Sequence, residues 1–163
     1  MTVGSVLLAV VAFIAMEPVT YLAHRFVMHG RGFVWHRSHH ARRAGRFEQN
    51  DLFPVVFASA TIVAIAIGTQ VPAVAWLVPV GAGVTAYGLA YLFVHDAYIH
   101  RRVPGLTRRI RVFERLAEAH ALHHRFGGEP YGMLCPIVPA RLRARAASAA
   151  TPEGRGVGVD RVA

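Results

Sequence analysis

The residues best suited to do chemistry are histidines, and their positions repeat along the chain. The sequence holds ten of them, and none lies outside four short groups. Each half of the pattern has the spacing HxxxxH followed by the spacing HxxHH, and the two halves together comprise His24, His29, His36, His39, His40, His95, His100, His120, His123 and His124. Two matched pairs of groups indicate a shared chemical role rather than scattered surface histidines.

The spacings indicate metal binding. On an α-helix, side chains three and four positions apart lie on one face. We therefore expect His36, His39 and His40 to converge on one small volume, and the HxxHH group at residues 120–124 to do the same. Residues five positions apart are about 140° apart on an ideal helix. Each HxxxxH pair is therefore expected to sit beside rather than on one metal, or to lie at a helix end that unwinds.

The number of histidines favours two metal ions. Neutral imidazole binds zinc, copper, iron and nickel. One zinc ion needs three or four protein ligands, so ten histidines fit two ions with about five each. Open positions for O2 require a redox metal, which favours iron over zinc. A zinc hydrolase of the HExxH type is not favoured, because neither HxxHH group contains a glutamate.

Long apolar stretches must position these groups. Hydrophobic residues make up 54% of the chain and charged residues 17%, against about 25% charged residues in ordinary soluble domains. No charged residue or histidine occurs from residue 52 to residue 94, and Gly68–Pro72 in the middle is a turn signal. We expect the first span to continue through Glu17 toward His24. The predicted membrane-spanning helices are Thr2–Met16, Leu52–Ile67 and Ala73–Val94.

The charges predict which side of the membrane carries the histidines. All 18 basic residues are arginine, and the formal net charge is +9. Arginines gather at residues 25–46, after the first span, and at residues 101–115, after the third. The positive-inside rule then predicts that the N-terminus lies outside and that the histidines lie on the cytoplasmic side of the membrane. We attribute the positive charge to a surface that faces anionic lipid rather than to nucleic-acid binding.

The chain is expected to form one domain over residues 1–150. Its predicted fold is a small all-α bundle of about three to four transmembrane helices with a cytoplasmic, histidine-rich helical cap. Residues 151–163 are glycine-rich, which is typical of a disordered tail. The single cysteine, Cys135, excludes an internal disulfide and a cysteine-based zinc module. The sequence has no cysteine cluster for an iron–sulfur centre and no Rossmann glycine fingerprint, so electrons must come from another protein.

The text around the histidines carries a family resemblance. AHRFVMHG at residues 23–30, WHRSHH at 35–40 and FEQNDLF at 47–53 mark the first half, and TAYG at 85–88 precedes His95 and Asp96 in the second. In this order and spacing they resemble the membrane-bound fatty acid hydroxylase (sterol desaturase) superfamily of non-haem di-iron oxygenases. The similarity covers roughly residues 17–135. The text between the histidine groups resembles the bacterial carotenoid-hydroxylating branch of that superfamily.

The resemblance implies a monooxygenase that hydroxylates carbon 3 of carotenoid β-ionone rings, converting β-carotene through β-cryptoxanthin to zeaxanthin. It also implies two iron ions, O2 as co-substrate, and electrons from a ferredoxin-type donor and ultimately NAD(P)H. Two alternatives stay open. One is an oxygenase of the same superfamily that acts on a fatty acid, a sterol or a sphingoid base, and the other is a non-enzymatic metal-binding protein of the membrane.

We assign all ten histidines as metal ligands, without dividing them between the ions. Metal-bound histidine usually donates its second N–H to an acceptor, and Asp96, Asp51 and Asn50 are candidates for that role. The alternative for each acid is to cap a helix or to pair with an arginine. Glu17 is expected to line the site or to pair with arginine. Residues 108–115 are expected to dock an acidic ferredoxin or to face lipid. The candidates for lining an apolar path to the site, for a substrate that arrives from the lipid phase, are Tyr21, Tyr87, Tyr91 and Phe93.

Overall fold

A computed structural model describes residues 2–41, 47–106 and 108–149, and every regular element in those ranges is helical. The predicted tail at residues 151–163 lies outside the described residues. In chain order the helices are α1 (Val3–Leu22), the π-helix η1 (Ala23–Arg31), α2 (Phe33–His40), the 3-10 helix η2 (Gln49–Asp51), α3 (Leu52–Gln70), the 3-10 helix η3 (Pro72–Val74), α4 (Leu77–Tyr91), the π-helix η4 (Leu92–Ile99), α5 (Arg111–Phe126) and α6 (Ala140–Ser148). The all-α fold class is confirmed.

Three of the helices are long and apolar enough to cross a membrane. Their large apolar side chains point outward: Ile14 on α1 is 64% exposed, and Ile62 on α3 is 66% exposed. A helix that is apolar all round and not buried in protein is typical of a segment in lipid. The three candidate spans, which include the adjoining 3-10 and π-helical segments, are Val3–Arg31, Gln49–Gln70 and Leu77–Ile99.

The hairpin between the second and third spans turns later than the sequence predicts. α3 continues through the predicted turn to Gln70, and the chain reverses around η3. Gly68 stays helical at a place where α4 passes close by, since a Cβ there would lie 3.0 Å from the Cβ of Leu77. Pro72 starts the 3-10 turn, because a proline has no N–H with which to continue the helix.

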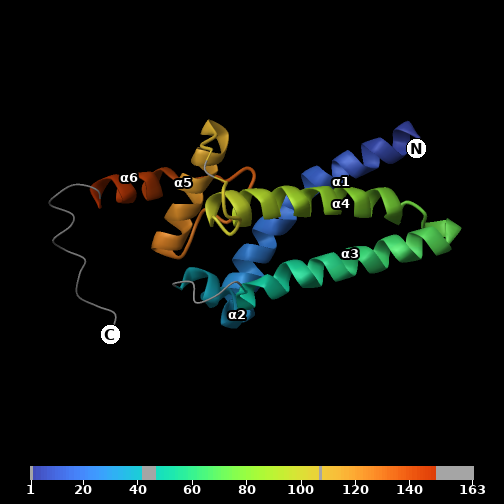
Figure 1. Cartoon of the computed structure of the whole chain (residues 1–163), viewed down its shortest axis with the longest axis horizontal. Coiled ribbons are helices and arrows are strands. Elements are labelled where there is room, and N and C mark those ends of the chain that lie inside the picture. The colour runs from blue at the N-terminus through green and yellow to red at the C-terminus, as the bar shows by residue number, and fades with distance from the viewer. Residues whose placement is uncertain (1, 42–46, 107, 150–163) are drawn as a thin grey trace.

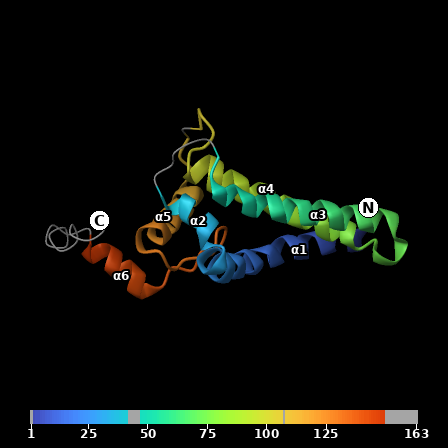
Figure 2. The same cartoon turned by 90° about the horizontal axis from the view of Figure 1, so that it is seen from below.

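α4 packs against both α1 and α3 and so holds the bundle together (Figure 2). Two glycines allow this close packing. A Cβ on Gly83 would lie 2.1 Å from the carbonyl oxygen of Ala9 in α1, and a Cβ on Gly81 would lie 2.3 Å from the side chain of Ile65 in α3. Small residues at such interfaces let membrane helices approach closely. The α1–α4 distance therefore depends on a glycine at position 83.

Replacing Gly83 with alanine is expected to destabilise the bundle, because the new methyl group meets the backbone of α1. Overpacking of this kind costs about 1–3 kcal/mol. Gly88 on the same helix offers a matched control, since a Cβ there would meet nothing within 4 Å. Thermal unfolding in detergent should show a lower midpoint for Gly83→Ala than for Gly88→Ala. Equal midpoints would contradict this packing.

The histidine-bearing helices gather at one end of the bundle. The N-terminus and the α3–α4 turn lie at the far end, whereas α2, α5 and α6 lie together at the other (Figure 1). The π-helices η1 and η4 extend the first and third spans into that same end. The described structure therefore brings all four histidine groups to one side of the spans.

Candidate metal centre

Each HxxxxH pair lies on a π-helix at the end of a membrane span. His24 and His29 belong to η1, and His95 and His100 lie in and directly after η4. A π-helix bonds each N–H to the carbonyl five residues earlier, and the His100 N–H donates to the His95 carbonyl oxygen at 2.9 Å. Residues five apart then share a face. The first alternative, a pair that sits beside rather than on one metal, assumed α-helical geometry and is wrong. The second alternative, a helix end that departs from α-helical geometry, agrees with the structure.

Each HxxHH group is divided between two clusters, so the expected convergence of its three rings is wrong. In α2 the rings of His36 and His40 lie in one cluster and the ring of His39 in the other. In α5 His123 and His120 are separated in the same way. The reason lies in helix geometry: positions i+3 and i+4 are about 100° apart around the axis and face different sides.

The two clusters can be defined by their ligand atoms, which lie within 4.8 Å of one another in each. We call them cluster 1 and cluster 2. His124 lies between them, with its Nε2 atom 2.9 Å from the Nε2 of His120 and its ring stacked on that of His40 at 4.5 Å. Cluster 1 comprises His24, His29, His36, His40 and His123, and cluster 2 comprises His39, His95, His100 and His120.

The duplicated sequence pattern corresponds to an exchange between the two halves of the chain. Each cluster takes an HxxxxH pair and the first histidine of the following HxxHH group from its own half. Each also takes one histidine from the other half: His123 joins cluster 1 and His39 joins cluster 2. Since His124 contacts His120, it occupies in the second half the place that His40 occupies in the first. The two HxxHH helices therefore each serve both clusters.

Among the described residues, an oxygen atom contacts Nδ1 of five histidine rings and so orients them. In cluster 1, Nδ1 of His24 lies 3.0 Å from the carbonyl oxygen of Tyr131, and Nδ1 of His123 contacts the carbonyl oxygen of Gly128. A carbonyl oxygen accepts hydrogen bonds and cannot donate them, so Nδ1 carries the proton and Nε2 carries a lone pair. The oxygen partners of the other three Nδ1 atoms are Oδ1 of Asn50 for His36 at 2.7 Å, Oε2 of Glu48 for His39 at 3.2 Å, and Oδ2 of Asp96 for His95 at 3.3 Å.

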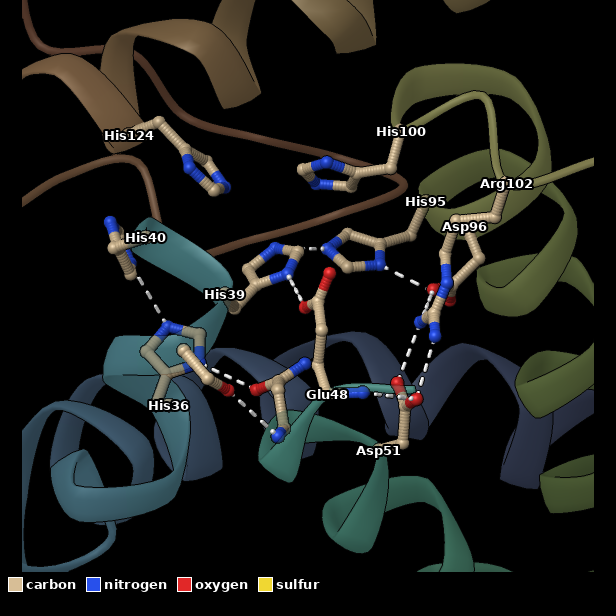
Figure 3. Close-up of polar contacts among 12 residues, drawn as sticks. His36, His39, His40, Glu48, Asp51, His95, Asp96, His100, Arg102 and His124 are labelled. Atoms are coloured by element: carbon tan, nitrogen blue, oxygen red, sulfur yellow. Dashed lines mark hydrogen bonds and ion pairs between the residues drawn. The ribbon is translucent and has the colours of Figure 1, made fainter. Parts of the chain in front are cut away.

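These tautomers leave nitrogen lone pairs facing one another. Nε2 of His24 lies 3.1 Å from Nε2 of His36. Nε2 of His39 lies 3.0 Å from Nε2 of His95 (Figure 3). Two lone pairs at that distance repel each other unless a cation lies between them. Metal-bound histidine characteristically donates its other N–H to a carboxylate or a carbonyl. The donor set of both clusters therefore fits a metal ion.

The distances between ligand atoms also indicate how an ion would be coordinated. Two nitrogens that each lie about 2.1 Å from one ion are about 3.0 Å apart at a right angle and about 3.4 Å apart at the tetrahedral angle. Five pairs of Nε2 atoms within the two clusters lie 3.0–3.1 Å apart, and the Nε2 atoms of His124 and His120 lie 2.9 Å apart. The spacing thus fits nitrogen ligands that share one ion.

Burial keeps the rings neutral, as metal binding requires. Loss of solvent around the charged form lowers the pKa of His36 to about 3 and that of His123 to about 4. It lowers the pKa of His124 to about 2, with a smaller contribution from the neighbouring His40. These imidazoles are therefore uncharged at neutral pH and offer lone pairs rather than protons.

Comparison with known proteins identifies the family. The model of the fatty acid hydroxylase family matches residues 9–139. The chain belongs to the fatty acid hydroxylase family. A beta-carotene hydroxylase of Pseudescherichia vulneris is 45% identical, with 85% of this chain and 80% of that protein aligned. One from Pantoea ananas is 43% identical over 78% of this chain and 72% of its own length, and one from Paracoccus sp. (strain PC1) is 38% identical over 77% of each. No solved structure matches the chain.

Fatty acid hydroxylases are membrane-bound enzymes, which agrees with the three spans of this chain.

Within this hydroxylase the three residues predicted to accept a hydrogen bond from a histidine have different partners. Asn50 and Asp96 contact Nδ1 of a histidine, whereas Asp51 pairs with an arginine. Asp51 instead accepts two hydrogen bonds of 2.6 Å from Arg102, which also donates to Asp96 at 2.6 Å (Figure 3). Arg102 thereby ties the segment after α2 to the end of η4.

The four aromatic residues proposed to line a substrate path lie in different environments. Tyr91 stacks on the ring of His95 at 4.9 Å. The hydroxyl of Tyr87 donates to Glu17, and the hydroxyl of Tyr21 donates to Glu129. Phe93 is 43% exposed on the outer side of its span.

Residues that sequence reasoning missed line an apolar groove of about 240 Å³ beside cluster 1. The groove lies between η1, α2 and α3, and its walls include Met28, Trp35, Phe53 and Phe57. Met28 directly precedes His29, and Trp35 directly precedes His36. The sequence offers one signal for this groove, since Trp35 and Phe53 flank the histidine-rich text of the first half.

Glu17, Glu48 and Arg102 are the other polar residues whose places the sequence did not predict. Among the residues that the structure describes, Glu17 contacts neither a cluster histidine nor an arginine; it accepts hydrogen bonds from Tyr87 and from the segment after α5. Glu48 lies in the motif text at 47–53 and orients His39. Its proximity to Asn50 could have suggested this role. Nothing in the sequence distinguishes Arg102, which pairs with Asp51 and Asp96, from the other arginines.

Proposed function

We propose that this chain is a di-iron oxygenase that hydroxylates carbon 3 of carotenoid β-ionone rings, converting β-carotene through β-cryptoxanthin to zeaxanthin. The observation that carries the proposal is the pair of buried histidine clusters, whose lone pairs face one another at the end of membrane spans. The names of the relatives support the substrate class. The reaction consumes O2, two electrons and two protons, and yields one hydroxyl group and one water.

Iron is the metal we propose for both clusters. Cluster 1 with five histidines, and cluster 2 with four and His124 beside it, would hold one ion each. When bound, iron would supply the activation of O2 that a carbon–hydrogen bond requires. The protein's own part is to hold neutral imidazoles in fixed tautomers and to exclude water, since His36 and His123 are almost fully buried.

The substrate is proposed to arrive from the lipid phase through the apolar groove. A carotenoid is a hydrocarbon about as long as the bilayer is thick, so its ring reaches the membrane surface while its chain stays in lipid. The walls of the groove are apolar, and the ring centroids of Phe53 and His36 lie 6.5 Å apart. This position would bring a ring carbon next to cluster 1 without exposing it to water.

Orientation and electron supply complete the proposal. We propose that the clusters lie on the cytoplasmic side of a bacterial inner membrane, with the N-terminus outside. The arginine-rich segments support this orientation through the positive-inside rule. Electrons would come from a ferredoxin-type protein and ultimately from NAD(P)H. Exposed arginines on α5 and α6, among them Arg111, Arg115 and Arg143, offer a positive face to an acidic donor.

Expression in a host that accumulates β-carotene tests the proposal directly. We expect the pigment to be converted to β-cryptoxanthin and zeaxanthin, as measured by chromatography of the extracted carotenoids. The matched control is His36→Ala, which removes a buried cluster ligand. Unchanged β-carotene in cells that contain the folded, iron-loaded protein would contradict the carotenoid assignment, and new hydroxylated fatty acids or sterols in their place would favour the other branches of the family.

A further inference from the structure

Glu17 lies within α1, in the first span, and accepts an unusual number of hydrogen bonds. Its Oε1 atom accepts from the backbone N–H groups of Met133 and Cys135, both at 2.9 Å. Its Oε2 atom accepts from the N–H of Leu134 at 3.1 Å and from the hydroxyl of Tyr87 at 2.6 Å. All four partners are donors, and a carboxylate is the side chain that accepts at both oxygens.

The segment held by Glu17 connects α5 to α6 and folds back toward α1 and α4 (Figure 1). We call residues 127–139 the return segment. It supplies the carbonyl oxygens of Gly128 and Tyr131, which orient the two cluster 1 rings of His123 and His24. The ring of Tyr131 also lies edge-on to three cluster 1 histidines, with centroid distances of 5.2–5.5 Å.

Gly132 makes the contact with Glu17 possible. A Cβ at this position would lie 2.9 Å from Oε1 of Glu17 and 3.3 Å from the carbonyl oxygen of Cys135. Any side chain there must displace either the carboxylate of Glu17 or the return segment. The fit between Glu17 and the return segment is therefore close on both sides.

Cluster 2 is oriented by other residues. Glu48 contacts Nδ1 of His39, and Asp96 contacts Nδ1 of His95. Glu48 lies on the segment after α2, and Asp96 lies in η4. Neither residue belongs to the return segment. The two clusters thus depend on separate supports.

We infer that Glu17 is a positioning residue for the metal of cluster 1, acting through the return segment on His24 and His123. Glu17→Gln keeps the shape of the side chain but turns an NH2 group toward backbone N–H groups, so the segment loses part of its attachment. Loss of such an orienting partner typically weakens metal binding about 10- to 100-fold. We expect this loss at cluster 1 and not at cluster 2. The inference rests on the proposed metal binding but not on the choice of substrate.

Iron retention in the full-length protein tests the inference. The protein is purified in detergent without oxygen, loaded with ferrous iron and dialysed against graded chelator concentrations, and iron per chain is measured. Wild-type protein is expected to retain two iron ions, whereas Glu17→Gln should release one of them at about 10- to 100-fold lower chelator concentration. Gly132→Ala should behave in the same way, because it disturbs the same contact from the other side.

A background variant shows which ion is lost. In His36→Ala, where cluster 1 already lacks a ligand, Glu17→Gln is expected to leave the remaining iron unchanged, whereas Glu48→Gln should weaken it. The inference is overturned if Glu17→Gln retains both ions like the wild type, or if it weakens the remaining iron in the His36→Ala background, as a general loss of stability would. A failure of the carotenoid test with this pattern intact would refute the substrate and leave the inference standing.

Discussion

His39→Ala is expected to abolish hydroxylation and to remove the metal of cluster 2, although His39 lies in the same HxxHH group as two cluster 1 residues. Its Nε2 atom lies 3.0 Å from that of His95, and Glu48 fixes its tautomer. Because residues that act as a unit fail together, we expect product formation to fall by at least about 1,000-fold. Carotenoid analysis measures the activity, and elemental analysis should give one iron per chain.

Double variants test the exchange between the halves. If the clusters are as the structure has them, His39→Ala with His95→Ala still removes one metal, since both residues belong to cluster 2. His39→Ala with His36→Ala removes both metals. If each HxxHH group bound its own ion, the first combination would remove two metals and the second would remove one. The opposite pattern would therefore refute the division of α2 between two clusters.

Exchange of iron for zinc is the second change with a large expected effect. Zinc has no redox chemistry, so a zinc-loaded protein is expected to fold normally and to form no hydroxylated product. Reloading with ferrous iron should restore activity. The measurement is product formation by purified protein with O2 and an electron donor, before and after exchange, with circular dichroism as the control for folding. Full turnover with zinc alone would contradict an oxygenase and favour a different chemistry.

The sequence predicts the spans well because the bilayer is a demanding solvent. A stretch without charge that is long enough to cross the membrane has few alternatives to a helix. The sequence predicts the helix boundaries less well: it predicts Gly68 as a turn residue, but in the structure Gly68 stays helical and packs closely against Leu77. Glycine has both uses, and local sequence does not distinguish them.

The sequence also predicts which residues gather but not how they divide. That all ten histidines lie at one end follows from the spans and the charges. The π-helical ends, which bring His24 and His29 together, depend on hydrogen bonds that no spacing rule for α-helices describes. The assignment of His39 and His123 to opposite clusters depends on how α2 faces α5, which is a property of packing.

Backbone partners are the part of the site that residue types cannot reveal. The carbonyl oxygens of Gly128 and Tyr131 orient two rings, yet every residue has a carbonyl. The same holds for the three N–H groups bound by Glu17. The sequence shows only that Glu17 is a carboxylate next to a proline within an apolar helix. Its partners depend on how the return segment packs against α1.

The central claim is that two histidine clusters each hold one iron and that both are needed for hydroxylation. Its most direct test is a titration of metal-free protein with ferrous iron, in which bound iron per chain and the rate of β-carotene hydroxylation are measured on the same samples. We predict that activity rises with loading and reaches its plateau at two iron ions per chain. Full activity at one ion per chain, or binding of two ions with no hydroxylation at any loading, would contradict the claim.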